Sequence, residues 1–342
     1  QGAFDVELNL TGLSGQQNLI IKAIDLAGNS QENTQIVIIS QLTPDTTAPS
    51  ITASLNNDTG INTDGITFDS TITGTVTDIS EITKFQAKLN SGNFVDVLSK
   101  LQNGIFTLDK DTLTVINGGQ LPDGNYQITL KAEDKFGNVS NEVKLDFTLD
   151  TTKPAVATEL KIKDDTDTVT KDNTPIISGQ AEAGTKVQIF DGQTKLGETI
   201  SENGVWEITT SQLTDGVKNL TVITTDIADN VSDNASLLIT VDTVVPDFNI
   251  TSPQANATLN SGARLQGTVN GTGSTIDKLT YRFGEGSEIN VPVNAQGAFD
   301  VELNLTGLSG QQNLIIKAID LAGNSQENTQ IVIISQLTPD TT

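Results

Sequence analysis

The segment Pro44-Asp45-Thr46-Thr47-Ala48-Pro49 separates two runs of alternating apolar and polar residues. Proline fixes φ, has no N–H to donate and restricts the residue before it, so such a segment ends a sheet. Three related segments follow: Asp150-Thr151-Thr152-Lys153-Pro154, Asp242-Thr243-Val244-Val245-Pro246 and Pro339-Asp340-Thr341-Thr342. Each segment is predicted to be a joint between domains, and we call its aspartate the joint aspartate.

An exact internal repeat sets the domain plan. Residues 1–47 reappear without change as residues 296–342. An identity of this length indicates a tandem array, so the chain is predicted to be a fragment of a longer protein. The joint aspartates are 105, 92 and 98 residues apart, which is too long for solenoid units. The predicted domains are residues 47–150, 151–242 and 243–342, and residues 1–46 form the C-terminal half of another.

The strand pattern predicts an all-β chain. Each predicted domain holds about seven short alternating runs, one of them Thr112–Val115, with turns such as Asn90-Ser91-Gly92-Asn93 between them. This spacing is typical of Ig-like β-sandwiches, and no segment shows a helical apolar period. We therefore expect tandem Ig-like sandwiches in an extended rod.

The N-terminal half-domain has only three predicted strands, Phe4–Leu10, Asn18–Asp25 and Gln35–Ser40. Three strands with one bare apolar face are not expected to be stable alone. Three interpretations stay open: the half is disordered, another copy completes it, or the chain is a window cut from a continuous polymer.

The charge balance limits the partners. The chain has 43 acidic and 19 basic residues, a net charge of −24, and no histidine, cysteine or methionine. This charge repels nucleic acid and anionic membranes and attracts divalent cations, although a merely solvating acidic surface is the alternative. No apolar run is long enough to span a bilayer, so no direct membrane insertion is expected. Without histidine or cysteine the usual nucleophile–base pairs are missing, so we do not expect an enzyme.

A second motif, Asp-x-x-Gly-Asn, recurs before the last strand of each domain. It begins at Asp25, Asp134 and Asp320, and the middle domain has the variant Asp226-Ile227-Ala228-Asp229-Asn230. Such a turn can be a simple hairpin loop. However, its first residue precedes the next joint aspartate by 20, 16, 16 and 20 residues. We therefore predict that both aspartates lie at the C-terminal pole of their domain, near the first loop of the next domain.

Acidic residues in those first loops complete the predicted metal sites. Carboxylate and amide oxygens without histidine or cysteine favour Ca²⁺ over zinc or copper, and Mg²⁺ demands a stricter octahedron. No EF-hand loop is present, so each site would be composite. The predicted ligands are Asp25, Asp45, Asp58, Asp64, Asp134, Asp150, Asp164, Asp165, Asp167, Asp172, Asp226, Asp242, Asp320 and Asp340.

The middle domain contains three distinctive motifs: Asp172-Asn173-Thr174-Pro175-Ile176-Ile177-Ser178-Gly179, Ala181-Glu182-Ala183-Gly184-Thr185 and Asn203-Gly204-Val205-Trp206. In these motifs it resembles the bacterial Ig-like repeats of giant secreted calcium-binding surface adhesins. The resemblance implies calcium at domain junctions, an extended rod and export to the bacterial cell surface, by type I secretion. Asp229 replaces the usual glycine, and the loop 252–258 has no acidic residue. These departures single out the Asp242 joint as the weakest candidate.

Two functions are compatible with these features. The first is the stalk of a large extracellular adhesin, stiffened by Ca²⁺ at the domain junctions, whose ligand-binding tip for a glycan or protein lies elsewhere in the parent protein. The second is the repeating subunit of an extracellular filament or surface layer that polymerises head to tail or laterally. In both, the expected partners are other copies or domains of the same protein. Direct glycan binding by these domains has no aromatic cluster to support it.

Overall fold

The computed structural model describes residues 3–40, 45–164 and 167–335. Within them almost every regular element is a β-strand, which confirms the predicted all-β fold. Backbone contacts group the chain into two compact units, Gln1–Asn57 with Asp69–Thr148 and Asp58–Phe68 with Leu149–Thr342. In the described ranges no helix is long and apolar enough to cross a membrane.

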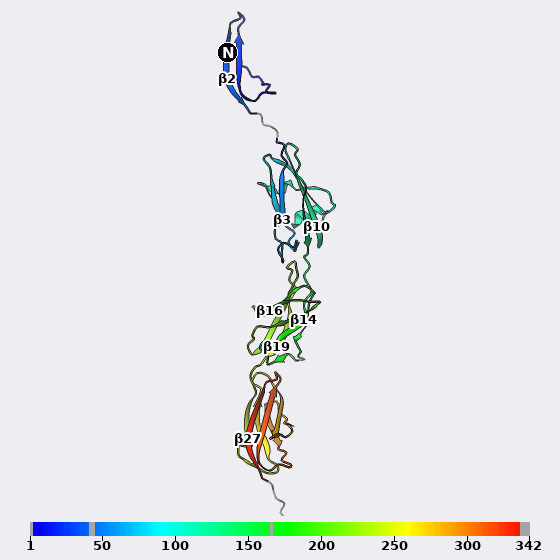
Figure 1. Ribbon diagram of the computed structural model, residues 1–342, viewed down its shortest axis with the longest axis vertical. Helices are drawn as coiled ribbons and strands as arrows, with labels where there is room; N and C mark the ends of the chain where they lie inside the picture. The colour runs from blue at the N-terminus through cyan, green and yellow to red at the C-terminus, as the bar shows by residue number, and fades with distance from the viewer. Residues whose placement is uncertain (1–2, 41–44, 165–166, 336–342) are drawn as a thin grey trace, which may run out of the picture. The chain divides into compact units, whose positions relative to one another are not determined.

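An N-terminal hairpin comes before three two-sheet sandwiches. The hairpin consists of β1 (Gly15–Ile24) and β2 (Ser30–Ile39), paired antiparallel (Figure 1). The first sandwich contains β3 (Ser50–Leu55), β4 (Ile66–Thr67), β5 (Ile72–Thr77), β6 (Ile82–Leu89), β7 (Val95–Asp96), β8 (Leu101–Gln102), β9 (Ile105–Leu108), β10 (Gly124–Asp134) and β11 (Val143–Leu149).

The second and third sandwiches repeat this plan. The second contains β12 (Thr158–Ile162), β13 (Val169–Thr170), β14 (Ile176–Gln180), β15 (Lys186–Asp191), β16 (Thr194–Ile200), β17 (Val205–Thr209), β18 (Gly216–Thr225) and β19 (Ala235–Val241). The third contains β20 (Asp247–Ser252), β21 (Thr258–Leu259), β22 (Arg264–Asn270), β23 (Ile276–Phe283), β24 (Ile289–Asn290), β25 (Ala298–Glu302), β26 (Gly310–Asp320) and β27 (Ser325–Ile334).

Each sandwich has a larger and a smaller sheet. The larger sheets share one strand order: β4-β11-β10-β6-β7, β13-β19-β18-β15-β16 and β21-β27-β26-β23-β24. The smaller sheets are β3-β5-β9-β8, β12-β14-β17 and β20-β22-β25. The two-residue strands β13 and β21 run parallel to the last strand of their sandwich. These short strands were not predicted, because two residues are too few to show an alternating period.

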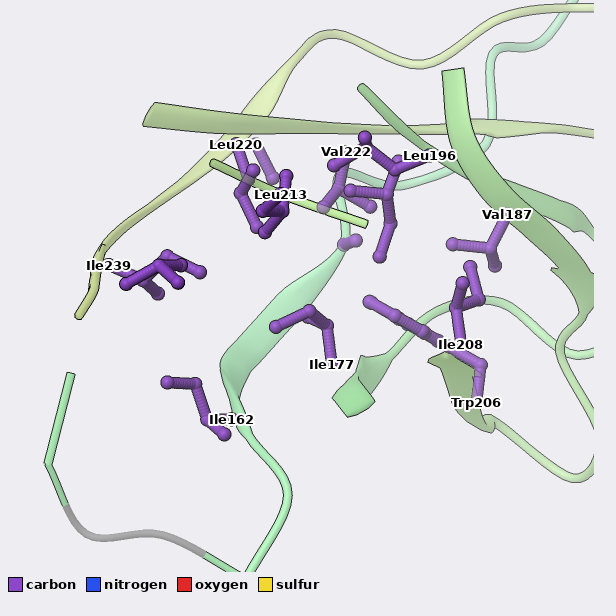
Figure 2. Close-up of a cluster of buried hydrophobic side chains, with 14 residues drawn as sticks. Ile162, Ile177, Val187, Leu196, Trp206, Ile208, Leu213, Leu220, Val222 and Ile239 are labelled. Carbon is purple, nitrogen blue, oxygen red and sulfur yellow. The ribbon is translucent and has the colours of Figure 1, made fainter. Parts of the chain in front are cut away.

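The core of each sandwich lies between its two sheets. In the second sandwich, Ile177 and Trp206 of the smaller sheet pack with Val222 of the larger one (Figure 2). The first sandwich is closed by an aromatic contact, because the rings of Phe85 and Phe106 lie 4.9 Å apart. Alternate residues of each strand therefore face one shared core, as Ig-like packing requires.

A glycine lies opposite an aromatic residue in each smaller sheet. The register pairs Gly74 with Phe106, Gly179 with Trp206 and Gly267 with Phe299. A Cβ atom at each of these glycines would come within 2.6 to 2.7 Å of the facing ring. The ring therefore lies over the glycine backbone, which is a close approach that no larger residue allows.

The repeated sequence has two different environments. Phe4 is 75% exposed and Ile21 is 37% exposed, whereas their counterparts Phe299 and Ile316 are 3% and 0% exposed. Strand β25 pairs with β22 in the third sandwich, but the identical residues 3–7 form no strand. The predicted strand at Phe4–Leu10 is therefore wrong, because its hydrogen-bonding neighbour is not beside it. The other two predicted strands are confirmed as β1 and β2.

One predicted strand is a helix. Residues Thr112–Val115 lie in α1 (Lys110–Ile116), after the 3₁₀ turn Leu98–Lys100. Asp109 caps this helix by accepting a hydrogen bond from the backbone N–H of Thr112. Leu113 and Ile116 are buried, and their i, i+3 spacing places both on the same face of the helix. Four residues are too few for an alternating pattern to distinguish a strand from a helix.

The exact repeat offers a matched pair of core mutations. Phe299→Ala is expected to lower the free energy of unfolding of the third sandwich by about 3–5 kcal/mol, because it removes a buried ring. Phe4→Ala should change stability by less than about 0.5 kcal/mol. Hydrogen exchange of the β22 and β26 amides measures the first effect, and that of the β1 amides measures the second. Equal losses at the two positions would contradict the assigned burial.

Candidate metal centre

The four turn motifs share one set of hydrogen bonds. In each, one carboxylate oxygen of the turn aspartate accepts from the backbone N–H of the asparagine four residues later, and the other oxygen accepts from that asparagine's side-chain amide. The residue before the asparagine has positive φ in every copy, including Asp229 at 73°. The substitution of glycine by Asp229 therefore leaves the turn intact.

The same asparagine binds the joint that begins its sandwich. The amide nitrogen of Asn138 donates to the carbonyl of Asp45 at 2.9 Å, that of Asn230 to Asp150 at 2.9 Å and that of Asn324 to Asp242 at 2.7 Å. These contacts lie at the N-terminal pole of each sandwich. The predicted pairing of each turn with the following joint is therefore wrong. One antiparallel strand carries the chain about 3.3 Å per residue toward the opposite pole.

The acidic first loops also lie at the pole opposite to the predicted one, again because a strand carries the chain from one pole to the other. The N–H of Asp150 donates to the carbonyl of Thr67, and that of Asp242 donates to Thr170. The loop after the first strand of a sandwich therefore lies at its C-terminal pole. At that pole the Thr59 hydroxyl donates to the carbonyl of Ala228 in the next turn motif.

Most acidic residues of the first loops accept hydrogen bonds from within their own loop. Asp58 accepts from the backbone N–H groups of Thr63 and Gly65, although its other oxygen is buried and has no protein donor. Asp64 accepts from the N–H of Ile66, and Asp172 accepts from Thr174. Asp164 has a left-handed backbone, and Asp167 lies in the same loop. Asp165 and Asp340 lie outside the described residues.

Asp45 and Asp134 lie together with Asp78, which the sequence prediction missed. One oxygen from each of these three carboxylates lies within 4.8 Å of the others, and no other triple in the described ranges is grouped this way. Asp78 directly follows β5, at the pole where the turn motif also lies. The only sequence signal for Asp78 was its position as an acidic residue directly after a strand. The corresponding loops of the other two sandwiches differ in sequence, so no repeated motif pointed to it. We call these three residues the joint cluster.

Hydrogen bonds lower the pKa of two members of the joint cluster, Asp45 and Asp134. Bonds from the Thr47 and Ser80 side chains lower the pKa of Asp45 to about 2. Burial alone would raise the pKa of Asp134, but the bonds from Asn138 outweigh it and the pKa is lowered. Asp134 is 1% exposed. None of the three carboxylates forms an ion pair with a described lysine or arginine. Three negative charges thus lie close together without a protein cation.

The donor set fits a hard divalent cation. It offers only oxygen, and the chain contains no histidine or cysteine. Carboxylate ligands suit Ca²⁺, whose coordination geometry is tolerant, whereas zinc and copper prefer nitrogen or sulfur ligands. Asp45, Asp78 and Asp134 are the residues that would hold the ion, and its positive charge would offset their mutual repulsion.

The other two joints are poorer in acids. At the Asp242 joint, Asp242 and Asp320 are both buried, but the loop 271–273 takes the place of Asp78. A Cβ atom at Gly273 would lie 2.4 Å from an oxygen of Asp242, and no third acid is grouped with Asp242 and Asp320 in the described ranges. At the Asp150 joint, Asp150 accepts from the N–H of Thr152, and Asp226 is held by Asn230. Within the described residues, the Asp25 carboxylate accepts hydrogen bonds from its own turn, from the N–H of Ala27 and from Asn29.

The lowered pKa of Asp45 predicts a pH-dependent joint. The folded state binds this proton more weakly than the unfolded state, whose pKa is the ordinary 3.8. The stabilisation is therefore complete above about pH 4 and is lost as the pH falls through about 2. Hydrogen exchange of residues 45–50 in EDTA should accelerate over this window in the natural chain. Asp45→Asn should flatten the profile, and parallel profiles would contradict the assignment.

Removing the asparagine amide should loosen the same pole. Asn138→Leu leaves the carbonyl of Asp45 and one oxygen of Asp134 without their donor, and we expect a loss of about 1–3 kcal/mol in the local stability of the first sandwich. Asn138→Asp keeps the size but adds a fourth negative charge, so its loss should be larger in EDTA than in Ca²⁺. Thermal unfolding with and without Ca²⁺ measures both. Asn117→Leu removes a side-chain amide that donates to the carbonyl of Gln120 in the same sandwich, so it controls for amide loss away from the cluster.

Comparison with known proteins identifies the family. A family model described as bacterial Ig-like domain matches residues 45–151 and 161–243. No protein with a curated description matches the chain.

Three solved structures illustrate the similarity. The tetra-tandem repeat in the extending region of a large adhesion protein is 18% identical, covers 96% of this chain and 84% of its own, and has a TM-score of 0.29. A Ca²⁺-stabilized adhesin that helps an Antarctic bacterium bind ice is 19% identical over 94% of this chain and 82% of its own, with a TM-score of 0.33. Fibronectin(III)-like modules of Clostridium thermocellum are 15% identical over 52% and 94%, with a TM-score of 0.34.

The family match spans more than half of the 342 residues. It falls on the first two sandwiches, whose larger sheets have the same strand order as that of the third. The chain therefore belongs to the bacterial Ig-like domain family.

Proposed function

We propose that this chain is a structural repeat region of a large extracellular bacterial surface protein, in which Ca²⁺ fixes the joints between domains. The chain is similar to the repeat regions of adhesins. The joint cluster of Asp45, Asp78 and Asp134 is the observation that carries the proposal. It lies where one predicted domain meets the next, and it concentrates negative charge with which no described lysine or arginine forms an ion pair.

The joint cluster would act on the direction of the linker. Asp45 belongs to the linker, whereas Asp78 and Asp134 belong to two loops of the first sandwich. Without a cation, their repulsion pushes the linker away from those loops. A cation shared by the three carboxylates supplies the opposite charge and draws the linker onto the sandwich. The joint then changes from a hinge to a fixed angle.

The repeats would supply length and position. Domains at residues 47–150, 151–242 and 243–342, with 1–46 as half of a further one, would form an extended rod on the bacterial surface. The rod would present a ligand-binding part of the parent protein away from the cell, in cell adhesion. We assign no catalytic role, since repeated sandwiches without histidine or cysteine offer no nucleophile–base pair.

Loss of one carboxylate should weaken calcium binding. Asp78→Asn is expected to lower the affinity of the first sandwich for Ca²⁺ by at least about tenfold, because ligand charge count sets affinity in oxygen sites. Asp111→Asn removes an exposed acid of the same sandwich and should have no effect. Calorimetric titration of the full chain measures both. Equal affinities in the two variants would show that the cluster is a solvated acidic surface.

Cation removal should also loosen the joint. We expect EDTA to raise protease cleavage at Thr46–Pro49 several-fold and to shorten the maximum dimension in small-angle scattering. Superimposable scattering profiles in millimolar Ca²⁺ and in EDTA would exclude stiffening while leaving the family assignment intact.

A filament or surface-layer subunit is the second candidate function. The inner apolar face of β1 and β2 favours it, because Leu19, Ile21 and Val37 are only partly covered, whereas their counterparts in the third sandwich are fully buried. Strands from another copy of this chain could cover such a face. Negative-stain images distinguish the two functions: a stalk gives single thin rods, and a filament gives axially or laterally ordered polymers.

A further inference from the structure

Lys171 reaches across the Asp242 joint. It directly follows β13, whose last residue Thr170 accepts a hydrogen bond from the backbone N–H of Asp242 at 2.9 Å. From this position the Lys171 ammonium donates to the carbonyl of Gly323 at 3.0 Å. Gly323 lies in the turn motif of the third sandwich. One cation of the second sandwich therefore contacts the turn that holds the joint.

The turn that Lys171 contacts contains unbalanced negative charge. Asp242 is fully buried and Asp320 is 1% exposed. Their oxygens accept from neutral donors, which include the Ser274 hydroxyl and the Asn324 amide. Neither aspartate forms an ion pair with a described basic residue. A nearby ammonium is attracted to both carboxylates, and burial reduces the screening of that attraction.

The equivalent positions in the other sandwiches are not cationic. Thr67, Thr170 and Leu259 are equivalent, because the carbonyl of each accepts a hydrogen bond from the backbone N–H at the end of the last strand of its sandwich. The residue that follows, which is Lys171 in the second sandwich, is Phe68 in the first and Asn260 in the third. At the Asp150 joint the contact to the next turn comes from the neutral Thr59 hydroxyl. Lys171 is therefore a feature of one joint and not of the fold.

The joint with a lysine also lacks a third acid. The Asp45 joint brings three carboxylates together, whereas no third acid is grouped with Asp242 and Asp320 in the described residues. Less negative charge needs less compensation. The ammonium of Lys171 and the missing third acid therefore both reduce the need for a divalent cation at the Asp242 joint.

We propose that Lys171 is a built-in cation that fixes the Asp242 joint without a divalent metal. The contrast with the Asp45 joint rests on the proposed function, but the role of Lys171 does not. One period of the repeat then contains joints of two kinds. Removing divalent cations loosens the Asp45 joint and leaves the second and third sandwiches fixed to each other.

Spin-label distances in EDTA test this proposal directly. The chain has no cysteine, so Gln193→Cys and Ser287→Cys place one label on an exposed hairpin of the second sandwich and one on the third. The distance distribution between them should be narrow in EDTA and should not narrow further with Ca²⁺. Lys171→Met keeps the aliphatic stem but removes the charge, and it should broaden the distribution in EDTA at least about twofold.

Two controls separate charge from packing. Lys171→Arg keeps the positive charge and should retain the narrow distribution. Lys161→Met removes a lysine from the same sandwich away from the joint and should have no effect. A distribution that is already broad in the natural chain in EDTA, or that stays narrow in Lys171→Met, would overturn the proposal. Because the variants are compared in EDTA, failure of calcium binding at Asp78 leaves the outcome of that comparison unchanged.

Discussion

In each sandwich one asparagine side chain connects the turn motif to the joint. Its amide carries two hydrogens, and the structure uses both: one bonds the carboxylate of the turn aspartate and the other bonds the carbonyl of the joint aspartate. A buried or half-buried amide that leaves neither hydrogen unpaired costs little and fixes two segments at once. The linker is thereby held to the sandwich that it begins. The position of the joint carboxylate, and with it the joint cluster, depends on this amide.

The repeated sequence shows how far local sequence determines structure. The hairpin forms in both copies with the same register: Gly15 pairs with Ile39 in the first copy, and the equivalent Gly310 pairs with Ile334 in the second. The strand at residues 298–302 forms only where β22 pairs with it. Hairpin pairing is local, so it needs only a turn and two complementary strands. The other strand depends on a neighbour distant in sequence, and burial of Phe299 depends on the same neighbour.

The sequence predicted the fold class and the joints but not the geometry of the joints. Alternating strands and turn residues are local signals, so the all-β fold and most strands were predicted. The pole of each turn was not, because the 16 or 20 residues between the turn and the next joint give a length without a direction. A strand between them reverses the pole. Asp78 was missed because it is an isolated acid, and α1 was missed because Asp109 caps it through a contact that alternation does not record.

The three joints show one frame with different charges. The asparagine amide and the turn backbone are common to all, and neither carries a net charge. The charged residues around them vary: three carboxylates near Asp45, a neutral hydroxyl from Thr59 near Asp150, and an ammonium near Asp242. Since repulsion between carboxylates grows steeply as they approach, we propose that an external cation completes this frame at the Asp45 joint and that Lys171 takes its place at the Asp242 joint. A repeat array built in this way can vary the stiffness of single joints by substituting loop residues, while the sheets stay unchanged.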